Sequence, residues 1–350
     1  MEIKVANHTI GRTHKPFVIA EMSGNHNQSL DRALKIVDAA AECGVQALKL
    51  QTYTADTITV KGAHTITDAN SIWKGKELYD LYKQAYTPWE WHGPIFEHAR
   101  KKGMIAFSSP FDETAVDFLE SLNVPVYKIA SFENTDHILL KKVAKTGKPV
   151  IMSTGVASIA DLQESIEVLR TAGCKELVLL KCTSTYPASP EHTNIFTIPH
   201  MRELFKCPIG LSDHTMGIGA AVASVALGAV VIEKHFTLSR ADGGVDSSFS
   251  LEPEELKMLS IETERAWQAT GSISYTLSEK EKKSLIYKRS LFVVKDIRKG
   301  ELFTAENIRS VRPATGLHTR YYEQVIGKRA SEAVPAGTPL AFRYIEGEAS

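Results

Sequence analysis

The chain has 350 residues, 43% of them hydrophobic, so it can bury one large core, or one large and one small core. Lys plus Arg and Asp plus Glu both number 41, and the resulting zero net charge predicts neither a nucleic-acid nor a membrane-surface partner. The four cysteines form no C-x-x-C pair, and the sequence shows neither a signal-type apolar region nor an apolar stretch long enough to span a bilayer. We therefore expect a cytoplasmic protein with reduced thiols.

Short apolar runs alternate with helix-like segments along most of the chain. After a small hairpin expected over the first ten residues, the runs predicted to be strands are residues 17–22, 47–53, 104–110, 126–131, 149–155, 177–187, 209–215 and 230–236. Several of the segments between them repeat apolar residues at i, i+3, i+4 and i+7 and end in glycine, as helices do. The alternation predicts an α/β fold, a (β/α)8 TIM barrel. A doubly wound sheet is the alternative, which the lack of G-x-G-x-x-G after the first strand disfavours.

The character of the sequence changes after residue 270. Residues 271–288 are polar and charged and are predicted to be a linker. Residues 289–350 combine short strand-like runs with turns and predict a small second domain. The barrel, with its hairpin, is expected over residues 1–270.

Polar side chains recur where the predicted strands end. In a TIM barrel these ends line the active site, so the residues are expected to surround one cavity. Strand periodicity also places Lys49 with Gln51, Ser212 with His214, and Glu233 with His235 on common faces. The strand-end residues are Glu21, Lys49, Gln51, Ser108, Ser109, Lys128, Ser131, Glu133, Ser153, Lys181, Thr183, Tyr186, Ser212, His214 and His235.

His214 and His235 end the last two predicted strands and would be neighbours at the rim. Two neutral imidazoles can hold one divalent ion and leave positions for water and substrate. Glu21, on the adjacent first strand, would lie beside that ion. The alternative is a pair of hydrogen-bonded rim histidines that bind no metal.

Lys49 and Lys128 interrupt apolar strands, where a lysine is rare unless an anion compensates it. Together with the serines nearby they suit a small ligand that carries phosphate and carboxylate groups, although either lysine alone could simply be solvated at the rim. Lys181 raises a different hypothesis, a Schiff-base nucleophile. A structural lysine, or one paired with a carboxylate, is the favoured interpretation of Lys181.

The segment 71–92 is rich in aromatic residues. It could form a wall against a sugar ring. Its helical spacing equally suits packing on the outside of the barrel, and we favour packing for most of these residues.

A series of motifs resembles the sialic acid synthase family. In chain order they are IAEMSGNH, LKLQTY, FSSPF, YKIASFE, STG, KCTSTYP, GLSDHT and IEKHF. The segment VKDIRKGELFTAENIRSVRP resembles the antifreeze-protein-like (SAF) domain of that family. Within the family, WKGKELYDLYKQAYTPWEWH and RPATGLH are most similar to the pseudaminic acid synthases.

The resemblance implies a reaction and a set of site residues. The family condenses phosphoenolpyruvate with an N-acetylated aldose and water to give a nine-carbon 2-keto acid and phosphate, with cleavage of the C–O bond. The resemblance implies that Glu21 and Asp246 transfer protons. It implies that His214 and His235 bind a divalent ion, commonly Mn²⁺ in the family, with Mg²⁺ or Co²⁺ as alternatives. The residues implied to bind phosphoenolpyruvate are Lys49, Ser109, Lys128, Ser131, Ser153 and Ser212, and those implied to bind the sugar are Gln51, Glu133, Tyr186, Asp246 and Arg312.

The resemblance further implies a domain-swapped homodimer. In it, Arg312 of one chain would reach the sugar bound in the other chain's barrel. The expected sugar is a 2,4-diacetamido-2,4,6-trideoxy-L-altrose, and N-acetylneuraminate or legionaminate synthesis by the same chemistry is the alternative. A Schiff-base aldolase and a non-enzymatic sugar-binding protein are less favoured, because sugar binding alone requires neither the lysines nor the histidines.

Overall fold

A computed structural model describes residues 1–68 and 71–347 of the chain. The chain forms two compact units, Met1–Gly271 and Ser272–Ser350, which are described here one at a time. Residues 348–350, the end of the predicted second domain, lie outside the described residues. In the described ranges no helix has the length and apolar character needed to cross a membrane.

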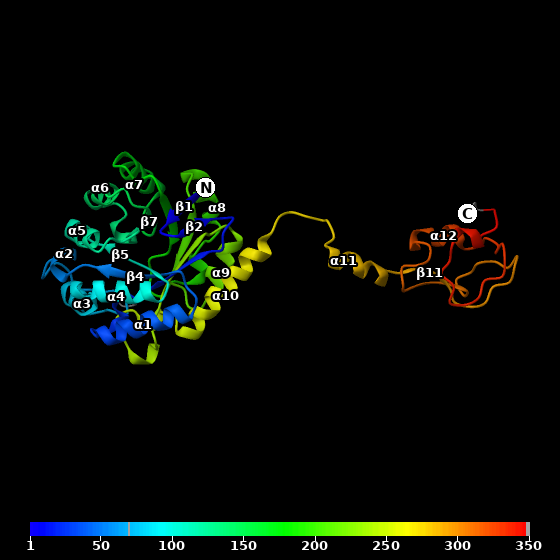
Figure 1. The fold of residues 1–350 in the computed structure, drawn as a ribbon, viewed down its shortest axis with the longest axis horizontal. Helices are drawn as coiled ribbons and strands as arrows, with labels where there is room; N and C mark the ends of the chain where they lie inside the picture. The colour runs from blue at the N-terminus through cyan, green and yellow to red at the C-terminus, as the bar shows by residue number, and fades with distance from the viewer. Residues whose placement is uncertain (69–70, 348–350) are drawn as a thin grey trace. The chain divides into compact units, whose positions relative to one another are not determined.

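The first unit is a closed barrel of parallel strands (Figure 1). The strands of the barrel are β3 (Phe17–Glu21), β4 (Ala47–Thr52), β5 (Ile105–Pro110), β6 (Tyr127–Ile129), β7 (Val150–Ser153), β8 (Leu177–Cys182), β9 (Ile209–Asp213) and β10 (Val231–His235). The last strand, β10, pairs with both β9 and β3 and so closes the barrel. This arrangement confirms the predicted TIM barrel.

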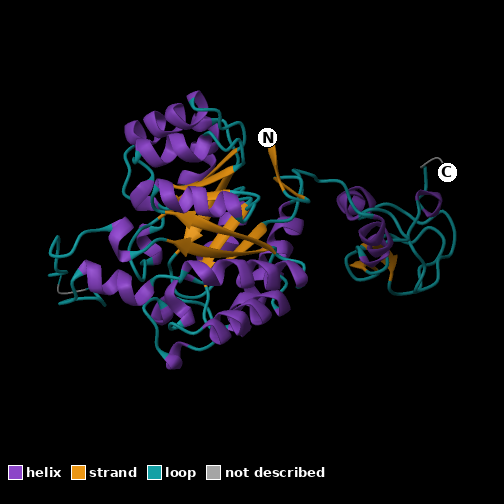
Figure 2. Ribbon diagram, turned by 60° about the vertical axis from the view of Figure 1, so that its left-hand side comes forward, coloured by secondary structure: helices purple, strands orange, loops and turns teal. Residues whose placement is uncertain are grey.

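Helices surround the strands (Figure 2). Those that follow the strands are α1 (Leu30–Glu42), α4 (Trp89–Lys101), α5 (Glu113–Ser121), α6 (His137–Ala144), α7 (Ile159–Thr171), α8 (Thr197–Phe205), α9 (Gly219–Ala226) and α10 (Pro253–Thr270). Several begin where the sequence supplies an N-cap: the side chains of Ser29, Asp112 and Ser158 accept hydrogen bonds from the first turns of α1, α5 and α7. Their apolar faces pack on the strands in one continuous core.

A hairpin precedes the barrel, as the sequence predicts. Strand β1 (Glu2–Val5) pairs antiparallel with β2 (His8–Gly11). Alternation buries Ile3, Val5 and Ile10, which join the core cluster of the barrel.

The longest insertion in the barrel lies between β4 and α4. It contains two short helices, α2 (Ala55–Ile58) and α3 (Leu78–Ala85). Further single turns of 3-10 helix follow other strands, among them η1 (Ser23–His26), η2 (Ser131–Glu133), η3 (Pro190–His192), η4 (Arg240–Asp242) and η5 (Ser247–Phe249). All of these segments follow the carboxyl ends of strands, where loops carry function in this fold.

Strand register decides which side chains enter the barrel. Glu21 pairs with both Lys49 and His235, and Glu233 pairs with Ser212. Because neighbouring residues in register share a face, all of these side chains point inward. At Gly210 a Cβ atom would lie only 2.4 Å from the Val231 carbonyl oxygen, so this position of β9 has room for glycine alone.

The second unit is small. Strand β11 (Ser290–Val293) pairs antiparallel with β12 (Ile308–Val311), and Leu291, Phe303 and Leu340 belong to its separate core. Its helical segments are α11 (Glu279–Ser284), η6 (Leu285–Tyr287), η7 (Thr319–Tyr321), α12 (Tyr322–Val325) and η8 (Phe342–Tyr344). The stretch predicted as linker thus contains α11 and η6.

Candidate active site

A cavity of about 430 Å³ opens at the carboxyl ends of the barrel strands. Its lining includes six of the residues predicted from the sequence: Gln51, Ser131, Glu133, Tyr186, His235 and Asp246. The insertion between β4 and α4 supplies much of the remaining wall, including Ile58, Trp73 and Leu81. Of the other residues with predicted roles, those buried on inward strand faces are Glu21, Lys49, Ser109, Lys128, Ser153 and Ser212, and the buried His214 directly follows β9. Ser108, also predicted to face the cavity, lies on the outward face of β5.

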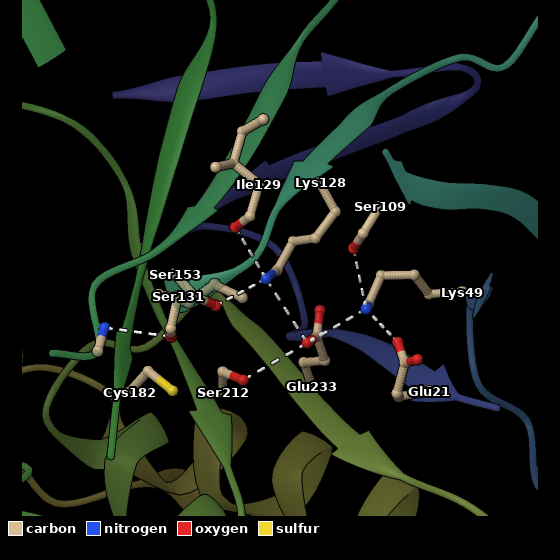
Figure 3. Close-up of polar contacts among 12 residues, drawn as sticks. Glu21, Lys49, Ser109, Lys128, Ile129, Ser131, Ser153, Cys182, Ser212 and Glu233 are labelled. Carbon is tan, nitrogen blue, oxygen red and sulfur yellow. Dashed lines mark hydrogen bonds and ion pairs between the residues drawn. The ribbon is translucent and has the colours of Figure 1, made fainter. Parts of the chain in front are cut away.

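Two buried lysines share one carboxylate inside the barrel. Figure 3 shows Glu233 between Lys49 and Lys128, with an oxygen 3.7 Å from one ammonium nitrogen and 3.8 Å from the other. Glu21 also contacts the ammonium group of Lys49. The two distances to Glu233 exceed hydrogen-bond length, so this carboxylate neutralises both cations without saturating their donors.

Serine hydroxyls surround the lysines. Lys49 donates to Ser109 Oγ at 3.3 Å, and Lys128 donates to Ser153 Oγ at 2.7 Å. Ser212 Oγ lies 3.4 Å from Glu233 Oε1, and Ser131 Oγ accepts from the Gly155 amide at 3.2 Å (Figure 3). The predicted phosphoenolpyruvate residues therefore form one cluster of cations and hydroxyls.

Burial and charge act against each other in this cluster. Burial by itself would lower the pKa of Lys49, but Glu21 and Glu233 outweigh it and the pKa is raised. Burial would raise the pKa of Glu233, but Lys128 and Lys49 outweigh it and the pKa is lowered. Burial lowers the pKa of Lys128, and Lys49 adds to this effect. An anion placed among these groups would therefore relieve two desolvated cations.

The two rim histidines lie together, with ring centroids 5.3 Å apart. His214 Nδ1 is 3.0 Å from the Thr183 carbonyl oxygen, which can only accept, so this contact assigns the ring hydrogen to Nδ1 and the lone pair to Nε2. His235 Nδ1 is buried and has no hydrogen-bond partner. Burial, together with the neighbouring His214, holds the pKa of His235 well below its usual value, so this ring is neutral.

The histidine pair fits a divalent ion in its donor chemistry. The Nδ1 atom of His235, which has no hydrogen-bond partner, and Nε2 of the neighbouring His214 offer two lone pairs. Within residues 1–68 and 71–347, no cluster of three or more His, Cys, Asp or Glu side chains is arranged to hold a metal. The two histidines would thus leave most of the ion's coordination to water and substrate. Burial would lower the pKa of His214, but the Cys182 thiol outweighs it and raises the pKa, so protons would compete with the ion.

A serine that the sequence prediction missed connects the two predicted proton carriers. The Ser23 amide donates to Glu21 Oε1 at 3.0 Å, and its hydroxyl hydrogen-bonds Asp246 Oδ2. The same oxygen of Asp246 lies 3.9 Å from His235 Nδ1. Burial raises the pKa of both Glu21 and Asp246, which favours the protonated form of each carboxyl group.

Four of the five predicted sugar-binding residues line the cavity: Gln51, Glu133, Tyr186 and Asp246. The Tyr186 ring packs against His214 at 4.5 Å and against Phe249 at 5.4 Å between centroids. The carboxylate oxygen Oε2 of Glu133 is buried and has no hydrogen-bond partner. Burial raises the pKa of Glu133 to about 7.

The aromatic segment 71–92 plays both of the roles considered for it. Trp73 and Tyr82 line the cavity, and the Trp73 indole donates to the Val245 carbonyl oxygen at 3.1 Å. Trp89 instead stacks on Phe118 with ring centroids 4.7 Å apart, away from the cavity lining. Residues between 73 and 85 therefore supply part of the cavity wall, whereas Trp89 packs outside it. That this wall faces a sugar ring stays a prediction.

Lys181 does not face the site. Its neighbour Cys182 is in register with the inward-facing Ser212, so Lys181 points toward the helices. Its ammonium donates to Thr183 Oγ1 at 2.7 Å, and none of the ion pairs in the described part of the chain includes it. The structure thus gives no support to a Schiff-base role for Lys181. Among the described residues, Lys181 also has no carboxylate partner of the kind we considered.

Two residues need separate mention, Arg312 and Glu233. Arg312 directly follows β12 in the second unit and is exposed, and its approach to a barrel stays a prediction. Glu233 was not among the predicted site residues, although it lies at the centre of the charge cluster. The available signal was its spacing of two from His235, which places both side chains on one face of the strand. The four cysteines are buried and free, and the cytoplasmic location stays a prediction.

The fold and site define a TIM barrel with two buried lysines in its interior, and comparison with known proteins identifies its family. Residues 36–275 match the NeuB family, and residues 288–343 match the SAF domain. The chain belongs to the NeuB family, which confirms the resemblance to sialic acid synthases that the motifs indicated.

Several relatives resemble the chain over most of its length. It is 43% identical to a pseudaminic acid synthase of Campylobacter jejuni over 93% of this chain and 95% of that protein. It is 40% identical to the pseudaminic acid synthase of Helicobacter pylori, with 95% and 98% covered. An N,N'-diacetyllegionaminic acid synthase of Campylobacter jejuni is 37% identical, with 91% and 96% covered.

Solved structures agree with this assignment. An N-acetylneuraminic acid synthetase from Leptospira borgpetersenii has a TM-score of 0.73 at 32% identity, with 82% of this chain and 96% of that one covered. The spore coat polysaccharide biosynthesis protein SpsE of Bacillus subtilis has a TM-score of 0.67 at 34% identity and full coverage of both chains.

The raised pKa of Glu133 predicts a pH-dependent stability. A carboxyl group with a pKa of about 7 in the folded state and an ordinary pKa when unfolded stabilises the fold at acidic pH and loses that contribution as pH rises through 7. Glu133→Gln mimics the protonated form. Its free energy of unfolding, relative to that of the wild type, should therefore rise by up to about 3 kcal/mol between pH 4.5 and pH 8.

Urea unfolding followed by tryptophan fluorescence measures this gain for the barrel, because all four tryptophans lie in the first unit. Glu164→Gln, at an exposed position of α7, is the control and should show no such trend. A stability difference between Glu133→Gln and the wild type that stays constant with pH would contradict the assignment.

Proposed function

We propose that this chain is a pseudaminic acid synthase. It condenses phosphoenolpyruvate with 2,4-diacetamido-2,4,6-trideoxy-β-L-altrose and water, and releases phosphate by cleavage of the C–O bond. The observation that carries the proposal is the pair of buried lysines, Lys49 and Lys128, in the barrel whose cavity is lined by His235. The identity to two pseudaminic acid synthases over nearly the whole chain supports the choice of sugar.

Phosphoenolpyruvate binds at the lysine cluster. Lys49 and Lys128 offset its negative charge, and the hydroxyls of Ser109, Ser131 and Ser153 donate to its oxygens. Charge-assisted hydrogen bonds of this kind are roughly twice as strong as neutral ones and fix the ligand's orientation. Ser212 completes the cluster beside Glu233.

The condensation needs protons to move at two places. C3 of phosphoenolpyruvate attacks the aldehyde carbon of the sugar, whose oxygen gains a proton, and water adds at C2 and loses one. The tetrahedral intermediate then expels phosphate. Glu21 and Asp246 carry these protons, since both are buried, have raised pKa values and are connected through Ser23.

A divalent ion is the proposed cofactor, Mn²⁺ in the first instance, with Mg²⁺ or Co²⁺ as alternatives. His214 and His235 hold it through the lone pairs described above. When bound, such an ion acts as a Lewis acid that polarises the aldehyde of the open-chain sugar. Asp246, 3.9 Å from His235, stays available for proton transfer.

The sugar binds in the cavity above this cluster. Gln51, Glu133 and Tyr186 offer hydrogen bonds to its hydroxyl and acetamido groups, and the buried Glu133 oxygen without a partner suits an amide N–H. Ile58, Trp73 and Leu81 offer apolar surface to its methyl groups. A trideoxy sugar with two acetamido groups matches this division of the cavity. Legionaminate or N-acetylneuraminate synthesis by the same chemistry is the alternative.

The second unit is proposed to act in trans. In a homodimer with exchanged terminal domains, Arg312 of one chain would donate hydrogen bonds to the sugar held by the other chain's barrel. The support is the match of residues 288–343 to the SAF domain and the exposure of Arg312, whose guanidinium is free to reach a ligand. Excluding water from the site would strengthen its electrostatic contacts.

The proposed reaction predicts a specific sugar and a specific bond cleavage. Phosphate release from phosphoenolpyruvate should be fastest with the trideoxy-altrose, and it should be slower with the legionaminic precursor and with N-acetylmannosamine. Oxygen-18 placed in the bridging position should leave entirely in phosphate. Label retained in the keto acid, or an adduct trapped on Lys181 by borohydride, would contradict C–O cleavage by a synthase.

The proposed metal centre predicts loss of turnover on chelation and recovery with Mn²⁺. His214→Ala and His235→Ala should each lower turnover about a hundredfold or more, since polarisation by a metal is worth several kcal/mol. His200→Ala, on the exposed face of α8, is the control and should leave turnover unchanged. Full turnover after exhaustive chelation would overturn the metal requirement.

The exchanged domains predict complementation between two inactive variants. In a mixed dimer of His235→Ala and Arg312→Ala, the barrel with intact His235 receives the intact Arg312 of its partner. Mixing the two under conditions that allow subunit exchange should therefore restore turnover, to about a quarter of the wild-type value if chains pair at random, since half of the dimers are mixed and each has one complete site. If exchange is verified by mass and turnover does not return, the domain does not act in trans.

A further inference from the structure

A buried lysine on the outer side of the barrel touches the loop that carries one of the two rim histidines. Lys234 lies between Glu233 and His235 on β10, so its side chain points away from the barrel interior. It is 1% exposed. It therefore cannot reach a substrate bound inside the barrel, and its role must lie in what it contacts behind the rim.

The ammonium group of Lys234 makes three contacts, all to one short segment. It donates to Asp213 Oδ2 at 3.0 Å, to the Thr215 carbonyl oxygen at 2.5 Å and to the Gly217 carbonyl oxygen at 2.8 Å. The other oxygen of Asp213 accepts from the Thr215 amide at 2.9 Å. Residues 213, 215 and 217 are thereby fixed to β10, and His214 lies among them.

Strand pairing aligns the two histidine-bearing segments. Lys234 and Asp213 are register partners on neighbouring parallel strands. His214 follows Asp213 in sequence and His235 follows Lys234, so the ion pair ties together the two backbones from which the imidazoles project. On the inner side, His214 is oriented by the Thr183 carbonyl oxygen at 3.0 Å. The outer contacts fix its main chain, and the inner contact fixes its ring.

Stability alone does not explain a charged pair at this place. Other outward positions of these strands, such as Leu211 and Ile232, are apolar and fully buried. Replacing a buried ion pair by apolar residues of similar volume is often neutral or stabilising. Carbonyl groups of a tight loop need donors, however, and only a long cationic side chain supplies three from one position.

We infer that Lys234 is a positioning residue for the metal centre, which holds the loop of His214 in register with His235. The inference rests on the proposed function, in which the two histidines bind the ion. Outer contacts that orient metal ligands typically change metal affinity by tenfold to a hundredfold when they are lost. Lys234 acts through the backbone of the loop, and it touches neither ion nor substrate.

The test compares two variants on the same strand and the same outward face. Lys234→Met removes the three donated hydrogen bonds and keeps an unbranched side chain of similar length. Ile232→Ala lowers stability by opening a cavity two residues earlier and leaves the loop contacts in place. Mn²⁺ binding to the metal-free full chain is measured by calorimetry, together with the melting temperature and hydrogen exchange of the amides at 214–217.

Lys234→Met should weaken Mn²⁺ binding about tenfold or more and speed exchange in the loop. Ile232→Ala should lower the melting temperature while its dissociation constant for Mn²⁺ stays within about twofold of the wild type. Should Lys234→Met not fold because Asp213 is left buried and unpaired, the double variant Asp213→Asn, Lys234→Met removes both charges and answers the same question.

Equal Mn²⁺ affinity in the wild type and in Lys234→Met, or in the double variant, would show that Lys234 is purely structural. That result would leave the proposed function intact, since wild-type binding would still be seen. A wild-type protein that binds no Mn²⁺, Mg²⁺ or Co²⁺ would instead overturn the metal centre itself, and the positioning role with it.

Discussion

The central constraint on this barrel is the burial of charge in its interior. Lys49 and Lys128 are almost fully removed from water, and the carboxylates of Glu21 and Glu233 are buried among them. A lone buried ion is costly, so each of these groups can stay charged only while its partners keep their places. The surrounding architecture has to supply that rigidity, and a closed ring of parallel strands does so.

Closure of the sheet explains why the site can be assembled from residues far apart in sequence. Each strand contributes one or two polar side chains near its carboxyl end, and the fixed register brings them to a common level. A shift of one residue in any strand would turn its polar side chains toward the helices. The apolar core beneath the rim makes such a shift expensive, because it would place hydrophobic residues in the wrong layer as well.

Most of the barrel could be predicted from the sequence because its signals are local. Apolar runs, helix caps and the two-residue periodicity of strands identify elements and faces without knowledge of their partners. The role of Glu233 depends instead on two lysines from β4 and β6, and that of Ser23 depends on Asp246 over two hundred residues later. Such contacts become visible only when the strands are paired. The outward direction of Lys181 likewise follows from pairing, because its neighbour Cys182 is in register with the inward-facing Ser212.

The insertion between β4 and α4 separates two tasks that many active sites combine. The groups that hold and activate phosphoenolpyruvate in our proposal lie on the strands themselves, whereas Ile58, Trp73 and Leu81 belong to a segment added outside them. Substitutions in that segment leave the charge cluster and the strand register untouched. Such a chain can change the sugar it accepts in small steps while its bond-forming machinery stays constant, which is a route by which one ancestral catalyst could give rise to enzymes for different nine-carbon acids.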